Sequence, residues 1–251
     1  MEVRTTKMNN KIVVCLGKGG QRDQAESFAR RTDAPIQDKP GDYLTVRFDS
    51  KGVSLSGFGL TYQGNFVESM LHRVTNGRLQ HEMLVKAAKS DKEGRKAIDA
   101  TAGMGEDAFL LAAQGYEVTL YEQNPVIAAL LKDALRRAKK HMVLKEIAGR
   151  MQLVEGDSVE CLSRLMDPVD LIYLDPMFPT RQKSGLINKK LQLIQKLEPP
   201  CSAETDLFDA AIKANPQKIF VKRPLKSVHL AGREPSYILK GKAIRYDCYV
   251  I

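Results

Sequence analysis

The sequence predicts an α/β protein with a mostly parallel, doubly wound sheet, a C-terminal antiparallel hairpin and a small α+β region in front. Two observations lead to this prediction. From residue 96 onward, short apolar segments alternate with segments of helical apolar spacing, whereas residues 1–85 lack that alternation. A chain of 251 residues is long enough for both parts. We therefore expect an N-terminal α+β cap over residues 1–85 and a main domain over residues 86–251.

The predicted cap contains a few short elements. Strands are expected at 11–16, 43–48 and 53–55, and a helix at 24–31. The polar turn between the last two strands ends in glycine, which favours a hairpin. Helical spacing predicts two connecting helices at 66–74 and 79–88. The composition leaves two roles open for this cap: holding RNA, or covering a sheet edge.

The main domain is expected to alternate strands with helices. The predicted strands are 97–100, 118–122, 151–154, 171–174 and 218–221. The predicted helices are 107–114, 126–141, a short one ending at 165, then 188–197 and 204–214. Residues 237–240 and 243–250 predict the antiparallel hairpin. A parallel sheet closed in this way resembles the Rossmann-like fold of class I methyltransferases.

A glycine-containing turn follows the first predicted strand of the main domain. Asp99 ends that strand, and Gly103 and Gly105 lie in the turn before the next helix. Because glycine has no Cβ, the backbone can turn sharply and a ligand can come close. The turn is either a nucleotide-cofactor loop or an ordinary strand–helix turn. Glu122 favours the cofactor loop, since it ends the next strand about 20 residues after the first glycine, where an acid meets ribose hydroxyls.

Acidic residues in this turn bear on the choice of cofactor. Glu106 and Asp107 begin the helix, and Asp99 adds a third carboxylate. The spacing of Gly103 and Gly105 also fits a dinucleotide, but a pyrophosphate here would face like charges. S-adenosylmethionine has no phosphate and carries cationic groups that these acids would attract. Simple stabilisation of the helix N-terminus is the other explanation for the two helix acids.

Polar residues also follow the third strand of the main domain. Asp157 or Ser158 can hydrogen-bond the exocyclic amine of a bound adenine. Both residue types are equally suited to cap the following helix. One of the two could serve each role.

The fourth strand runs into Asp175-Pro176-Met177-Phe178-Pro179, which predicts a catalytic site. An exocyclic nucleobase amine is a poor nucleophile, because its lone pair is delocalised into the ring. Asp175 can accept the N–H bonds of such an amine, and Pro176 restricts the backbone so that the acid faces the crevice beyond the strand ends. Phe178 can stack on the base. A turn and a core aromatic are the alternative roles for these residues.

The charge of the chain indicates a polyanionic partner. The formal net charge is +9, and residues 176–196 contain basic residues without one acid. We expect RNA phosphates to be bound by Arg181, Lys183, Lys222 and Arg223.

Other functions are not indicated by the sequence. Four cysteines and four histidines are scattered without the spacing of a metal site, so no metal is expected. No apolar run approaches the ~20 residues of a membrane span. The apolar run 12–16 is too short for a signal peptide. We therefore expect a cytosolic protein.

Three blocks of the sequence resemble the ribosomal RNA small subunit methyltransferase J family. They are residues 99–109, 122–125 and 175–179, the last followed by Gln182-Lys183-Ser184. The resemblance implies S-adenosylmethionine-dependent methylation of the N2 amine of a guanine in small-subunit (16S) ribosomal RNA, free or in the 30S subunit. It implies cofactor contacts at Glu106-Asp107, Glu122-Gln123, Asp157-Ser158 and Asp175. The chain departs from the family at Glu106 and Gln123, which replace arginines.

Two other functions compete with this hypothesis. A NAD-dependent oxidoreductase could use the same glycine turn. A non-catalytic RNA-binding protein could keep a methyltransferase scaffold. The residues alone point to an exocyclic amine of a nucleobase, and only the resemblance selects guanine.

Overall fold

The structure is a computed structural model. It describes residues 12–39, 43–90, 92–176, 193, 197 and 204–251. These residues fall into two compact units. The smaller unit takes its residues from Met1–Gly64, Asn124–Asp133 and Thr180–Pro199, and the larger unit from Asn65–Gln123, Ala134–Pro179 and Pro200–Ile251. The domain boundary near residue 85 stays a prediction.

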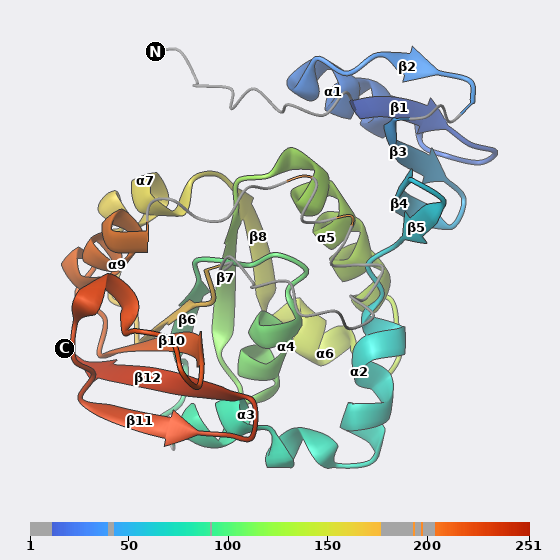
Figure 1. The fold of residues 1–251 in the computed structure, drawn as a ribbon. Helices are drawn as coiled ribbons and strands as arrows, with labels where there is room; N and C mark the ends of the chain where they lie inside the picture. The colour runs from blue at the N-terminus through green and yellow to red at the C-terminus, as the bar shows by residue number, and fades with distance from the viewer. Residues whose placement is uncertain (1–11, 40–42, 91, 177–192, 194–196, 198–203) are drawn as a thin grey trace. The chain divides into compact units, whose positions relative to one another are not determined.

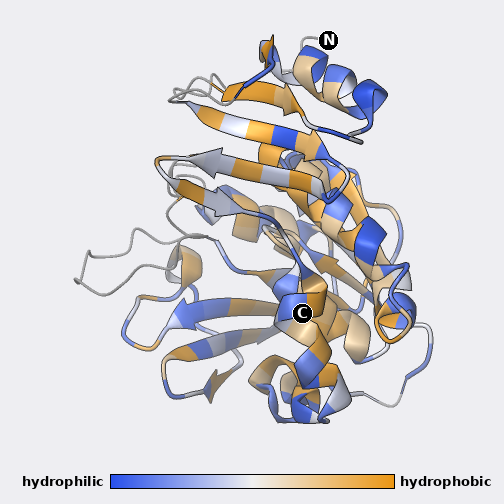
Figure 2. Cartoon of the chain, turned by 90° about the vertical axis from the view of Figure 1, so that its right-hand side faces the viewer, coloured by the Kyte–Doolittle hydropathy of each residue, from blue (hydrophilic) through white to orange (hydrophobic). Residues whose placement is uncertain are grey.

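Among the described residues of the smaller unit, five strands form one sheet in the order β2-β1-β3-β4-β5. They are β1 (Ile12–Leu16), β2 (Ile36–Gln37), β3 (Leu44–Asp49), β4 (Gly52–Gly57) and β5 (Leu60–Tyr62). β1 is parallel to β2 and β3, whereas β4 is antiparallel to β3 and β5. Apolar and polar residues alternate along β3 (Figure 2), and its Phe48 packs on Phe28 of α1 (Arg22–Thr32), with ring centroids 5.7 Å apart. The predicted α+β composition is confirmed.

The hairpin of β3 and β4 is tied to helix α5 (Pro125–Ala138) by a carboxylate. The Val53 N–H donates to Asp133 Oδ2 at 3.0 Å. Gly52 next to it has φ 116°, and a Cβ there would lie 2.2 Å from the same oxygen. Glycine is therefore required at this position both by the backbone conformation and by the close carboxylate.

In the larger unit, the described residues form a sheet of seven strands in the order β11-β12-β10-β9-β6-β7-β8 (Figure 1). The strands are β6 (Lys96–Asp99), β7 (Glu117–Glu122), β8 (Met151–Glu155), β9 (Leu171–Leu174), β10 (Lys218–Pro224), β11 (Tyr237–Lys240) and β12 (Ile244–Val250). β6 to β10 are parallel, and β12 is antiparallel to β10 and β11. The predicted parallel sheet with a C-terminal hairpin is confirmed.

The strand order positions the site. The chain passes from β6 to β7 and β8 on one side, and then crosses back to β9 and β10 on the other side of β6. The carboxyl ends of β6 and β9 therefore flank the point where the winding direction reverses. Ligands of such sheets bind in the crevice outside the strand ends at this point.

Helices complete the larger unit. They are α2 (Phe66–Thr75), η1 (Arg78–His81), α3 (Met83–Ala87), α4 (Glu106–Ala113), the end of α5, α6 (Lys145–Gly149), α7 (Ser158–Ser163), α9 (Glu204–Lys213) and η2 (Leu230–Gly232). After its acidic first turn, α4 is apolar and buried. Its Phe109 stacks on Phe66, with ring centroids 5.3 Å apart. Phe208 of α9 packs against Tyr249 of β12, with ring centroids 4.8 Å apart. The helix predicted at 188–197 lies outside the described residues.

No helix in the described part of the chain is long and apolar enough to cross a membrane. The same residues contain no group of three or more His, Cys, Asp or Glu side chains arranged to hold a metal ion.

Candidate active site

The ends of β6 and β9 are joined by hydrogen bonds through the start of the glycine loop. The Ala100 N–H donates to the Tyr173 carbonyl at 3.0 Å. The Thr101 hydroxyl accepts the Asp175 N–H at 2.7 Å, and the Thr101 N–H donates to Asp99 Oδ1 at 3.1 Å. Thr101 thus fixes the two strand-end acids relative to each other. Sequence reasoning gave no role to Thr101, although its place between Asp99 and Gly103 is a signal that could have found it.

The glycine loop is held by the acid at the end of the next strand. Gly103 and Gly105 have φ values of 52° and 73°, in the left-handed region that glycine adopts without strain. The Gly103 N–H donates to Glu122 Oε2 at 3.0 Å, and Glu122 is buried. Among the described residues, a Cβ on Gly103 would meet nothing nearer than the Thr101 carbonyl oxygen at 3.9 Å. Within the described part of the chain, no side chain fills the space beside Gly103.

Asp157 and Ser158 follow β8 at the same edge of the sheet. Asp157 accepts hydrogen bonds from the Val159 and Glu160 N–H groups at 2.8 and 3.2 Å, so it caps α7. The Ser158 hydroxyl donates to the carbonyl of Ala100, at the start of the glycine loop. Asp157 takes the capping role that was one alternative in the sequence, and the adenine contact stays a prediction.

A lysine joins two of the predicted acids. Lys222 Nζ lies 2.8 Å from Asp107 Oδ2 and 2.9 Å from Asp175 Oδ2. The Tyr173 hydroxyl donates to the same Asp107 oxygen at 2.7 Å. These contacts connect α4, β9 and β10 next to Asp99 at the end of β6. Neither the pairing of Lys222 nor the role of Tyr173 was predicted.

Burial shifts the pKa values of two acids at this site, Asp99 and Asp175. Burial raises the pKa of Asp99 to about 7, and the nearby Asp107 and Asp175 carboxylates act in the same direction. Burial also raises the pKa of Asp175, although the Lys222 ammonium opposes that rise. Burial favours the neutral form of Lys222, but its two carboxylates outweigh this and raise its pKa. Lys222 therefore stays charged.

Comparisons with known proteins agree with this geometry. Residues 52–251 match the family of SAM-dependent methyltransferases. Ribosomal RNA small subunit methyltransferase J of Pseudomonas savastanoi pv. phaseolicola is 37% identical over 244 residues, which cover 94% of this chain and 90% of its own. The chain belongs to the ribosomal RNA small subunit methyltransferase J family. The protein of the same name from Thioalkalivibrio sulfidiphilus is 37% identical, over 91% of this chain and 93% of its own. The crystal structure of a SAM-dependent methyltransferase from Neisseria gonorrhoeae matches with a TM-score of 0.72 and 26% identity, over 94% of this chain and 95% of that chain.

Family membership confirms the predicted class I methyltransferase fold and S-adenosylmethionine as the cofactor. It supports methyl transfer over both the NAD-dependent oxidoreductase and the non-catalytic RNA-binding protein. The site residues fit this cofactor on structural grounds. The open glycine loop is bordered by carboxylates, and Lys222 is already paired with two of them. Such a site suits a ligand with cationic groups and hydroxyls better than one with a pyrophosphate.

Of the remaining predicted residues of the methyltransferase site, the structure describes three and leaves three outside its described residues. Pro176 is buried directly after Asp175. Glu106 and Gln123 are exposed at the start of α4 and after β7. Phe178, Arg181 and Lys183 lie outside the described residues, so their roles in stacking and phosphate binding stay predictions.

The structure does not support the predicted phosphate contacts of Lys222 and Arg223. Lys222 is held by two carboxylates. The Arg223 side chain is only 3% exposed, and its Nε and Nη2 donate to the Val228 carbonyl at 3.1 and 2.7 Å. Its Nη1 lies 3.6 Å from Glu204. Burial and internal partners direct this guanidinium into the methyltransferase rather than toward RNA.

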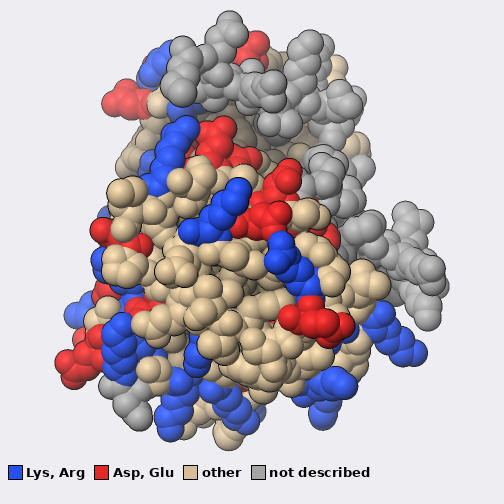
Figure 3. Space-filling model, turned by 90° about the vertical axis from the view of Figure 1, so that its left-hand side faces the viewer, with Lys and Arg blue, Asp and Glu red and all other residues tan. Residues whose placement is uncertain are grey.

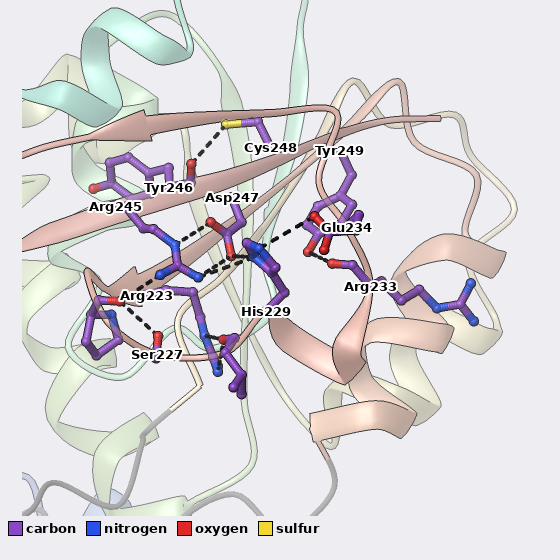
Figure 4. Close-up of polar contacts among 12 residues, drawn as sticks. Arg223, Ser227, His229, Arg233, Glu234, Arg245, Tyr246, Asp247, Cys248 and Tyr249 are labelled. Atoms are coloured by element: carbon purple, nitrogen blue, oxygen red, sulfur yellow. Dashed lines mark hydrogen bonds and ion pairs between the residues drawn. The ribbon is translucent and has the colours of Figure 1, made fainter.

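Arg223 lies in a cluster of charged residues next to the segment that follows β10 (Figure 4). Arg245 donates to the fully buried Asp247 at 2.7 and 3.1 Å, and His229 Nδ1 lies 2.7 Å from the same carboxylate. Arg245 also donates to the Leu225 carbonyl at 2.7 Å. Burial would raise the pKa of Asp247, but hydrogen bonds from Arg245 and His229 hold it below its usual range. This cluster fixes the segment directly after Lys222.

Proposed function

We propose that this methyltransferase transfers a methyl group to the N2 amine of a guanine in small-subunit ribosomal RNA. The observation that carries this proposal is Asp175, which follows β9 at the switch point of the sheet and is joined to the glycine loop through Thr101. The names of the relatives supply the substrate, since they act as small-subunit ribosomal RNA methyltransferases. We place the reaction in the cytosol, on free ribosomal RNA or on the 30S subunit.

The cofactor would be held by the glycine loop and by the acids at the ends of β6, β7 and β8. Glu122 accepts the Gly103 N–H of the loop, and its carboxylate would also accept hydrogen bonds from the ribose hydroxyls. Asp99, Asp107 and Asp157 add acceptors along the same edge. Bound S-adenosylmethionine supplies an electrophilic methyl group on a sulfonium cation.

Asp175 would orient the amine. Its N–H is used by Thr101 and its Oδ2 by Lys222, and within the described part of the chain Oδ1 accepts no hydrogen bond. Oδ1 can therefore accept an N–H of the guanine amine. This bond concentrates the lone pair on nitrogen and stabilises the positive charge that forms there during transfer. Pro176 has no backbone N–H that could compete with the amine for Asp175 Oδ1.

Phe178 would stack on the target base, and Arg181 and Lys183 would bind phosphates of the flanking RNA. A paired guanine would have to leave its stack to reach Asp175. These parts of the proposal rest on residue type and on the resemblance in sequence.

The proposal is tested by mass spectrometry of digested small-subunit ribosomal RNA from a strain lacking the gene. We expect one N2-methylguanosine to be lost, restored by the wild-type gene, and not restored by Asp175→Ala. Asp206→Ala, an exposed acid in α9, is the matched control and should restore it. Unchanged N2-methylguanosine in the deletion strain would overturn the proposal.

A further inference from the structure

Lys222 is a partly buried lysine near the carboxyl end of a central strand. It lies near the carboxyl end of β10, one residue after the Val221–Leu174 pair with β9, and opposite Tyr246 of β12. Only 26% of its side chain is exposed. Its ammonium binds the two carboxylates of Asp107 and Asp175 at 2.8 and 2.9 Å.

These contacts distinguish Lys222 from a lysine that binds phosphate. A lysine that binds an RNA phosphate must present its charge to the solvent. The Lys222 ammonium is instead shared between two acids. Moving it to a phosphate would leave two partly buried carboxylates without their cation.

The groups that face Lys222 come from every element around it. Asp107 belongs to α4, Asp175 follows β9, and Asp99 ends β6. The hydroxyl of the buried Tyr173 donates to Asp107, and its ring lies 6.2 Å from that of Tyr246. Asp107 and Asp175 thus bind one ammonium, and the Asp99 carboxylate interacts with the same charge. Without the ammonium, repulsion among the carboxylates would favour protonation of one of them.

We infer that Lys222 is a positioning residue for methyl transfer, which holds the Asp175 carboxylate charged and aimed at the target amine. It does so through its bond to Asp175 Oδ2, and it fixes Asp107 on α4 at the same time. This inference rests on the proposed role of Asp175 in amine methylation. It replaces the contact with RNA phosphate that the sequence suggested for Lys222.

The test compares Lys222→Met with Lys222→Arg and with Lys218→Met. Lys218 is the matched control, because it is an exposed lysine at the opposite end of the same strand. The rate kcat of methyl transfer to ribosomal RNA is measured against pH. An opposite charge at this range lowers a carboxyl pKa by about 1–3 units, so Lys222→Met should move the acidic limb of kcat up by about 1–3 pH units. Lys222→Arg should keep the limb near its wild-type position, and Lys218→Met should leave the profile unchanged.

A second readout needs neither cofactor nor RNA. The carboxyl ¹³C resonance of Asp175 is assigned by its loss in Asp175→Asn and titrated in the ligand-free protein. Its midpoint should rise by the same 1–3 units in Lys222→Met. Because this titration does not depend on activity, the inference can be judged even if the wild-type protein fails to methylate ribosomal RNA, which would count against the proposed function.

Thermal unfolding establishes whether Lys222→Met folds. If it does not, Lys222→Gln takes its place, because its amide can donate to the same carboxylates without charge, and the same shift is expected. A uniform fall in kcat with an unmoved Asp175 titration would overturn the inference. So would a rise in KM for RNA with a weaker salt dependence, which is the result for a phosphate contact.

Discussion

Replacing Asp247 with Asn is expected to lower the free energy of unfolding of the larger unit by about 3–5 kcal/mol. Asp247 is fully buried and accepts hydrogen bonds from Arg245 Nε and Nη2 at 2.7 and 3.1 Å, with His229 Nδ1 at 2.7 Å. An amide keeps the shape of the carboxylate but not its charge. The Arg245 side chain, 6% exposed, would then be a buried charge without its counterion.

Urea unfolding followed by circular dichroism measures this loss, and hydrogen exchange of the β12 amides assigns it to the larger unit. Asp209→Asn is the control, because Asp209 makes a similar pair with Arg233 at 3.2 Å on the surface, where the side chains are 41% and 56% exposed. It should cost less than about 1 kcal/mol. The folded-state pKa of Asp247 is lowered, so its stabilisation is present above the unfolded pKa of about 3.9 and is lost as pH falls through the folded value. A loss below about 1 kcal/mol for Asp247→Asn at neutral pH would refute the reasoning.

Three further changes have defined outcomes. Asp175→Ala should lower kcat about 10²–10⁴-fold in a tritiated-methyl assay, with the circular dichroism spectrum unchanged. Glu122→Ala should weaken S-adenosylmethionine binding by about 1.5–3 kcal/mol in calorimetry, because the loop amide loses a charged acceptor. Gly52→Ala should destabilise the smaller unit by about 1–3 kcal/mol through its clash with Asp133, whereas Gly59→Ala, which has φ 72° and no atom within 4 Å of its Cβ among the described residues, should cost less. Equal thermal stability of the two alanine variants would contradict the clash.

The sequence predicts most of the site because parallel strands align their ends. Once residues 96–174 are interpreted as alternating strands and helices, Asp99, Glu122 and Asp175 must come to one edge of the sheet, and the structure has them there. The glycine loop is equally local, since positive φ values are a property of Gly103 and Gly105 themselves. These features need only the chain direction and the strand order.

The partners of the basic residues could not be predicted in the same way. Whether Lys222 faces solvent or an acid depends on the register of β10 against β9 and on where α4 begins, more than a hundred residues earlier. β12 gives a second example. Arg245 and Asp247 alternate with Tyr246 and Cys248, a pattern typical of a strand with one solvated face. The structure buries both faces, because Pro224 at the end of β10 and Leu225 directly after it supply carbonyl oxygens that accept hydrogen bonds from Arg245 on the charged side.

The proposed reaction brings together a cationic cofactor and a polyanionic RNA, which favour opposite electrostatic potentials. The described site is acidic around the glycine loop, although the whole chain has a net charge of +9. The face drawn in Figure 3 carries basic groups interspersed with acids and uncharged surface rather than one continuous basic patch. Residues 176–196, in contrast, contain five lysines and arginines and no acid. Lys222, bound to two acids, reduces repulsion within the acidic part, and its charge is not available to RNA. The salt dependence of RNA binding should therefore respond to Arg181 and Lys183, and not to Lys222.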